Sequence, residues 1–305
     1  MSFSVLVSTF ANNIFPIVLI SGAGYVLARL FDIDPSSLGR VVFYVFSPVL
    51  IFDLMIKNRL ALSEAAVLIG FTVTIILTMG LLAYFIGSLL KIERPALISI
   101  LITTMFANTG NYGLPLVSFA FGEKALPYAG IYFVTTTFLF YTLGVLIASL
   151  GHMDFKDAAL GLFKVPTLYA VILAVIVNHW SIVMPTPIDR AVQLASNATI
   201  TLMLVLLGVQ MTRVEFSNNL RALQLSVALR LLIAPLAALL IAALFGIQGF
   251  ARQGAMTQAS MPSMVSSTVL ATEYQLDAKL VTAVVFVSTL LSPLTLTPLL
   301  VFLGR

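Results

Sequence analysis

Long runs of apolar residues follow one another along the whole chain and are separated by short polar links. A membrane-spanning α-helix needs about 20 predominantly apolar residues. The pattern therefore predicts ten such helices, numbered one to ten in chain order. They cover approximately residues 4–29, 37–56, 63–90, 95–121, 125–149, 158–179, 187–211, 220–246, 250–272 and 278–303. No link is long enough to hold a soluble domain, so we expect an all-α integral membrane protein.

Composition supports this fold class. The chain has 305 residues, of which 60% are hydrophobic and only 9% charged. A soluble domain carries about 25% charged residues, so most of this surface must face a lipid bilayer. The sequence has no cysteine, which excludes disulfides, thiolate nucleophiles and cysteine-based metal sites. The net charge of +4 comes from scattered basic residues, so we expect no nucleic-acid partner, and we also expect no cofactor.

Two of the predicted helices are interrupted in the middle, half a chain apart. The fourth is broken over residues 107–116, where we expect Gly110 and Gly113 to adopt backbone conformations that other residues resist and Pro115 to disrupt the preceding turn. The ninth is broken over residues 258–268, around Pro262. Backbone groups freed by such breaks cannot face lipid. Because a matched pair of broken helices is typical of a transporter's binding site, we expect the two breaks to meet at mid-depth.

Polar side chains at these breaks form the predicted substrate site. They are Asn108, Thr109, Asn111 and Tyr112 in the first break, and Gln258, Ser260, Ser263 and Ser266 in the second. A half-helix that starts at a break also directs its positive N-terminal end toward the site. Small hydroxyl residues ease close helix packing in membranes as well, so a packing role for any single serine stays open.

Arg230 lies near the centre of the eighth predicted helix, where an arginine costs roughly 2.5–3.5 kcal/mol on insertion scales. Two interpretations are equally favoured: Arg230 attracts an anionic substrate, or it caps backbone carbonyls of a broken helix or extends to the membrane interface. Neither break contains a carboxylate. The site should therefore favour an anion. His152 and His179 lie near helix ends, where an interfacial position is the default expectation.

The two halves of the chain resemble each other. Phe121, Ala125 and residues 133–136 follow the first break with the same spacing as Tyr274, Ala278 and residues 286–289 follow the second. Each half, 1–150 and 151–305, would hold five helices. An odd number places the second half in the membrane with inverted orientation. Basic residues divide nine to six between the two faces, which predicts both termini outside and the central link in the cytoplasm.

The residues at the breaks also resemble a known family. Asn108-Thr109, Gly113, Pro115-Leu116 and Gly122 are similar to the fourth-helix pattern of the auxin efflux carrier family. Gln258-Ala259, Pro262 and Glu273-Tyr274 are similar to its ninth-helix pattern. This family includes plant PIN-type carriers and bacterial permeases for malate and malonate. Val165 and Thr167 replace the asparagines of a plant Asn-Pro-Asn-Thr-Tyr motif, and the central loop around His152 is short; both departures argue against auxin as the substrate.

The resemblance implies further features. Helices one, two, six and seven would form a scaffold, and helices three to five and eight to ten a transport bundle in which the broken helices cross. The bundle would move as an elevator, and the protein would form a homodimer through the scaffold. By the same resemblance, the amide of Asn108 lies near the substrate carboxylate.

Together these observations predict a secondary transporter of small organic anions such as carboxylates in the cell (inner) membrane, with H⁺ or Na⁺ coupling left open. The alternatives are a Na⁺-coupled carrier of larger sterol-like acids on a related fold, an anion channel, or a sensor. We do not expect an enzyme. The sequence has no His-Glu-x-x-His motif, no paired aspartates for proteolysis and no acidic cluster for Mg²⁺.

Overall fold

A computed structural model of the chain describes residues 2–57, 60–149, 165–212 and 217–304. In these ranges the protein consists of helices, short links and one isolated β-bridge. The predicted boundary between the two halves, at residues 150 and 151, and the link around His152 lie outside the described residues.

Helices occupy the described part of every predicted range. The N-terminal part contains α1 (Phe3–Thr9), η1 (Phe10–Ile14), α2 (Phe15–Phe31), α3 (Pro35–Val41), η2 (Val42–Phe46), α4 (Ser47–Lys57) and α5 (Leu62–Leu89). There follow α6 (Arg94–Met105), η3 (Thr109–Gly113), α7 (Leu114–Phe121), α8 (Leu126–Leu139), η4 (Phe140–Gly144) and α9 (Val145–Ala148). The segments labelled η are single π-helical turns.

The second half begins, within the described residues, at α11 (Pro166–His179). It continues with α12 (Thr186–Gln210), α13 (Leu220–Ala228), η5 (Leu229–Ile233), α14 (Ala234–Leu244), α15 (Gly249–Ala259), α16 (Ser267–Glu273) and α17 (Ala278–Leu303). Several helices begin with proline in the first turn, where its missing N–H costs no intrahelical hydrogen bond.

Seven uninterrupted helices are long and apolar enough to cross a membrane, judged by length and composition over the described part of the chain. They are Phe3–Phe31, Pro35–Lys57, Leu62–Leu89, Leu126–Ala148, Thr186–Gln210, Leu220–Leu244 and Ala278–Leu303. Arg94–Met105 and Pro166–His179 are apolar but shorter. The all-helical membrane class is confirmed at this level, and the ten crossings in two inverted repeats stay a prediction.

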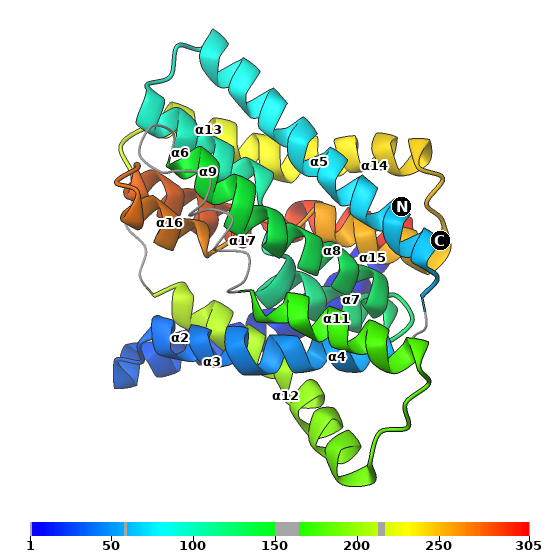
Figure 1. Cartoon of the computed structure of the whole chain (residues 1–305). Helices are drawn as coiled ribbons and strands as arrows, with labels where there is room; N and C mark the ends of the chain where they lie inside the picture. The colour runs from blue at the N-terminus through cyan, green and yellow to red at the C-terminus, as the bar shows by residue number, and fades with distance from the viewer. Residues whose placement is uncertain (1, 58–59, 150–164, 213–216, 305) are drawn as a thin grey trace.

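The helices pack in two groups (Figure 1). In the first group, α2 and α11 pack on α12 and α4 respectively, and α12 also contacts α4. Gly24 and Gly208 bring α2 and α12 into backbone contact: a Cβ atom at Gly208 would lie 1.8 Å from the carbonyl oxygen of Ser21. In the second group, α5 packs on α6, α8 and α14, and α15 packs on α8 and α14. The first group contacts the second mainly through α12, α4 and the N-terminal span.

Candidate functional site

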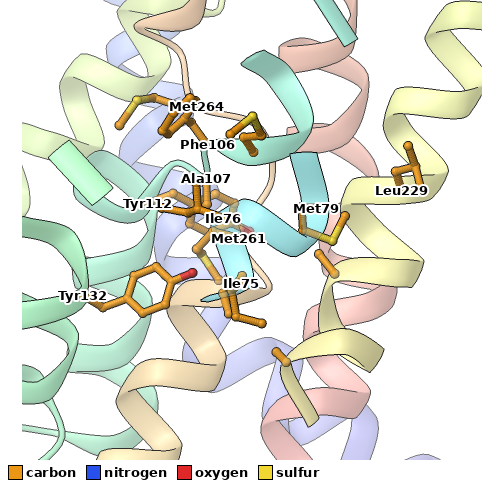
Figure 2. Close-up of a cluster of buried hydrophobic side chains, with 14 of the residues drawn as sticks. Ile75, Ile76, Met79, Phe106, Ala107, Tyr112, Tyr132, Leu229, Met261 and Met264 are labelled. Carbon is orange, nitrogen blue, oxygen red and sulfur yellow. The ribbon is translucent and has the colours of Figure 1, made fainter. Parts of the chain in front are cut away.

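The two broken helices meet at a short antiparallel crossing. Residues 106–108, between α6 and η3, are not helical and pair with the segment that follows α15 through a bridge between Ala107 and Ser263. The Asn108 N–H donates to the Pro262 carbonyl at 2.8 Å, and the Met264 N–H donates to the Phe106 carbonyl at 3.0 Å. Figure 2 shows Phe106, Ala107 and Met264 close together in this region. The crossing thus satisfies backbone groups that both helices leave unpaired.

The first interruption is shorter than the sequence predicts. Helix α6 ends at Met105 and helical structure resumes at Thr109, so most of the predicted break over 107–116 is helical. Pro115 lies in the first turn of α7, where proline needs no hydrogen-bond acceptor. Pro115 therefore does not break the helix, and the prediction that it does is wrong. Pro262, in contrast, lies within the extended segment between α15 and α16.

Gly113 is needed for space and not for an unusual backbone conformation, which corrects the predicted reason for the glycines. Its φ is −68°, and the described glycines with positive φ are Gly122, Gly246 and Gly249. A Cβ atom at Gly113 would lie 2.0 Å from the Oε1 atom of Gln258. Gly110 has a similar role, since its Cβ would lie 2.9 Å from the Phe133 ring. The first broken helix can therefore approach Gln258 of the second because Gly113 has no side chain, and Phe133 of α8 because Gly110 has none.

Four predicted site residues present buried polar atoms without a hydrogen-bond partner. These atoms are Nδ2 of Asn108, Oγ1 of Thr109, Oε1 of Gln258 and Oγ of Ser263. All four residues are at most 3% exposed. The Gln258 amide is partly anchored, because its Nε2 donates to the Ala129 carbonyl at 3.2 Å. A buried polar atom without a partner costs about 1–3 kcal/mol, so such a cluster calls for a ligand or a functional reason.

The other predicted polar residues are paired within the protein or lie at its edge. Ser260 donates its hydroxyl to the Met256 carbonyl at 2.8 Å, one turn back in α15. The Tyr112 hydroxyl accepts from Ser292 at 3.1 Å. Asn111 is half-buried and bonds a residue of α12. Ser266 is half-buried at the start of α16 and makes no side-chain cap. The substrate contacts of all eight residues stay predictions.

Arg230 is completely buried behind the crossing. Its Nε donates to the Met261 carbonyl at 2.6 Å, one terminal nitrogen donates to Thr104 at 3.0 Å and the other to Ala259 at 2.5 Å. These carbonyls lie at or just beyond the C-terminal ends of α6 and α15, where helix dipoles are negative. The arrangement corresponds to the second interpretation, carbonyl capping, and a direct contact with substrate stays a prediction. Arg230 makes no ion pair with any residue in the described ranges.

Comparison with known proteins agrees with this geometry. The family model described as "Membrane transport protein" matches residues 9–159 and 152–300. This chain belongs to that membrane transport family. The match also confirms the resemblance to auxin efflux carriers. A protein of Methanothermobacter thermautotrophicus named "Uncharacterized transporter" is 30% identical over 286 residues, covering 93% of this chain and 94% of its own. Another, from Methanocaldococcus jannaschii, is 26% identical, covering 92% and 93%.

Sequence reasoning missed other polar atoms of this transport protein. The hydroxyls of Thr136, Thr257 and Thr289 are also buried without a partner, and the Ser288 hydroxyl accepts the Ser263 N–H at 3.2 Å. A signal was present, because Thr136 and Thr289 occupy equivalent positions in the repeated pattern after the two breaks. Helical threonines usually bond a carbonyl of the preceding turn, so the sequence alone could not mark them as unpaired.

A cavity of about 150 Å³ lies between the two helix groups. Its lining comes from α4 and α11 of the first group and from α5 and α8 of the second, and includes Met55, Leu62, Ile131, Thr135 and Asn178. The cavity is mainly apolar. Gly130, which also lines it, directly follows Ala129, the residue that accepts the Gln258 amide. The boundary between the two helix groups, called the seam below, therefore contains a cavity close to Gln258.

Proposed function

We propose that this family member is a secondary carrier of small organic anions, in particular carboxylates, which bind at the crossing of the two broken helices. The observation that carries the proposal is the unpaired Nδ2 of the buried Asn108; Thr109 follows it in the chain, Ser263 pairs with the residue before it, and the hydroxyls of both are also unpaired. An amide N–H can only donate. A carboxylate would supply the missing acceptor, and hydrogen bonds to a charged group are about twice as strong as neutral ones.

The charge balance of the crossing supports an anion over a cation. Arg230 compensates the negative C-terminal ends of α6 and α15, and it makes no ion pair among the described residues. The helix formed by η3 and α7 starts at the crossing, so its N-terminal end adds positive potential there. Asp53, a buried acid outside the crossing, already pairs with Lys57 at 2.9 Å near the end of α4. The crossing therefore has a positive excess that a bound anion would neutralise.

We further propose that the two helix groups act as a scaffold and a moving bundle. The group around α2, α4, α11 and α12 would be the scaffold, because its helices make backbone-close contacts at Gly24 and Gly208. The group that contains the crossing would carry the substrate across. Moving one elementary charge across the membrane is worth about 2.3 kcal/mol per 100 mV. Export of a monoanion from a negative interior would accordingly need no coupled ion, whereas import would need H⁺ or Na⁺.

Transport in proteoliposomes tests the proposal. Radiolabelled dicarboxylates, keto acids and indole acids are offered one at a time, with and without the same acid on the opposite side. We expect saturable uptake that is stimulated by countertransport for at least one acid. Asn108→Ala should reduce that uptake about 10- to 100-fold, because a hydrogen bond to a charged group contributes about 1.5–3 kcal/mol.

Asn13→Ala is the matched control. Asn13 lies in η1, and its amide donates to the Thr9 carbonyl of its own helix at 2.9 Å. This variant should transport like the parent. Equal uptake by Asn108→Ala and the parent would show that the substrate does not bind at the crossing. Unitary currents in a planar bilayer would indicate an anion channel, and uptake of sterol-like acids that depends on Na⁺ would favour the other carrier class.

A further inference from the structure

One side-chain hydrogen bond joins the crossing to the opposite helix group. The Asn111 amide in η3 donates from Nδ2 to Oε1 of Gln210, the last residue of α12, at 3.2 Å. Both residues are half-buried. Asn111 therefore differs from Asn108 and Gln258, which are buried within the second group and have unpaired polar atoms.

Four other long-range side-chain hydrogen bonds of the described residues remain within one group. Asn178 and Thr199 donate to carbonyls of the span that contains η2 and α4, inside the first group. Arg230 and Gln258 donate to carbonyls inside the second group. The Asn111–Gln210 bond therefore depends on the relative position of the two groups, whereas these four do not.

Gln210 is held firmly on its own side. Two residues before it, Gly208 lies against the backbone of α2, where a Cβ would come within 1.8 Å of the Ser21 carbonyl oxygen. Close backbone packing of this kind is typical of stable helix pairs in membranes. Movement of the second group along α12 would therefore carry Asn111 away from Gln210, because α12 is held against α2.

The bond and the cavity lie at different points along the seam between the groups. The cavity is lined by residues near the end of α4, the start of α5 and the end of α11, such as Met55, Leu62 and Asn178. A short link from α11 places the start of α12 at that same end. Helix α12 then has 25 residues, which corresponds to about 37 Å at 1.5 Å per residue. Gln210 is thus at the end of α12 that is farther from the cavity.

We propose that Gln210 is a positioning residue that holds the Asn111 amide and thereby latches the two helix groups of the empty carrier together where α12 meets η3. This inference rests on the proposed carrier function and deepens it. A carboxylate that binds at the crossing is a stronger acceptor than the neutral Gln210 amide, so the Asn111 amide turns from Gln210 to the substrate. Release of Gln210 then frees the second group to move, which links movement to occupancy.

The test uses the empty carrier and needs no substrate. Because the natural chain has no cysteine, Thr109→Cys provides a single reporter thiol at the crossing. A membrane-impermeant maleimide is added from the side on which α12 ends, and labelling of Thr212→Cys identifies that side. We expect Gln210→Leu to increase the labelling rate of the reporter about two- to tenfold, the range that one hydrogen bond contributes.

Two further variants make the result specific. Gln193→Leu removes a glutamine from the same helix whose amide donates to Asp189 within α12, and it should leave the rate unchanged. Exchanging the pair, Asn111→Gln with Gln210→Asn, keeps the combined length and should restore the slow rate.

Equal labelling of Gln210→Leu and the parent would overturn the latch. If Gln210→Leu does not yield folded protein, Gln210→Glu decides: a charged acceptor should slow labelling, and an unchanged or faster rate would overturn the inference. Because labelling needs no ligand, a parent that transports no carboxylate would remove the proposed function separately.

Discussion

The two breaks in this protein have the same topology but are stabilised differently. The first is three residues long and continues directly into the π-helical turn η3, whereas the second extends over seven residues, 260–266, before α16 begins. Arg230 donates to two carbonyls at the second break, Ala259 and Met261, but to only one before the first, Thr104. The Ser263 N–H has a further partner in Ser288.

This difference indicates a division of tasks. The second break is fixed in place by side chains from other helices, and the first is fixed mainly by its pairing with the second. The first break is then able to present Asn108 and Thr109 with free polar atoms. The two breaks therefore need not contribute equally to the proposed site: the second would support the first, and the first would recognise the ligand.

The largest expected effect is from loss of Arg230. Arg230→Leu should lower the free energy of unfolding by about 3 kcal/mol or more, because it leaves three buried carbonyls without donors at about 1–3 kcal/mol each. Arg230→Lys should rescue little, since a lysine lacks the planar fork that reaches three acceptors. Thermal unfolding in detergent measures both.

Arg252→Met is the control, because it removes an arginine stacked on Phe302. It should lower the free energy of unfolding by less than about 1 kcal/mol. If Arg230→Leu and Arg252→Met lower the unfolding temperature equally, Arg230 does not support the crossing.

Gly113→Ala should have the next largest effect and should act through Gln258. The new methyl group would occupy the position of the Gln258 Oε1 atom, so the amide must rotate away from the crossing. We expect carboxylate uptake to fall about tenfold, because one charge-assisted contact contributes about 1.5 kcal/mol. In a Gln258→Ala background the same change should cost much less, since the clash is gone and the two effects are not additive.

Gly22→Ala is the control for Gly113→Ala. Nothing lies within 4 Å of a Cβ at Gly22 in α2, so this variant should transport normally. Two results would contradict this role of Gly113. One is normal uptake by Gly113→Ala, and the other is an undiminished loss of uptake when Gly113→Ala is added to Gln258→Ala.

Ser263 and Ser260 separate recognition from stability within the second break. The Ser263 hydroxyl is unpaired, whereas the Ser260 hydroxyl donates to Met256. Ser263→Ala should reduce uptake about three- to tenfold, less than Asn108→Ala, without lowering the unfolding temperature. Ser260→Ala should lower stability by about 1 kcal/mol, the value of one hydrogen bond, and leave uptake unchanged. Paired uptake and unfolding measurements decide, and a larger transport loss in Ser260→Ala would reverse the assignment.

The smallest effect is expected outside both breaks, at Asp34. Its carboxylate accepts from the Ser37 hydroxyl and from the backbone N–H groups of Ser36 and Ser37, and these bonds lower the pKa of Asp34 below its usual 3.8. A lowered pKa gives stability that is present above pH 3.8 and is lost as the pH falls through the folded-state value. Asp34→Asn should flatten this acidic part of the unfolding profile slightly and leave uptake at neutral pH unchanged.

The sequence predicts the elements well because hydropathy reports the environment of each segment directly. The two interruptions, the polar residues at them and the absence of acids there all follow from residue types. Gly113 also shows where such reasoning fails. A glycine at a break predicts an unusual backbone conformation, but the structure needs Gly113 for its close contact with Gln258, 145 positions later. Distances between segments so far apart are not encoded in local patterns.

Arg230 illustrates the same limit from another side. The sequence places a charge inside an apolar helix but cannot tell whether its donors reach a ligand or the chain, because both choices satisfy the same guanidinium. Only the positions of Thr104, Ala259 and Met261 decide this. The role of Gln210 is hidden for the same reason, since a glutamine at the end of a helix is ordinary by itself.

The Ala107–Ser263 bridge also has a consequence for biogenesis. Ser263 follows Ala107 by 156 positions in the chain. At a synthesis rate of about 5–20 residues per second, the ribosome delivers it roughly 8–30 s later. Throughout that interval the newly inserted first half holds the Phe106 carbonyl and the Asn108 N–H without the partners they have in the finished protein. The nascent chain must therefore shelter these groups, in water or against a membrane insertase, until translation is nearly complete.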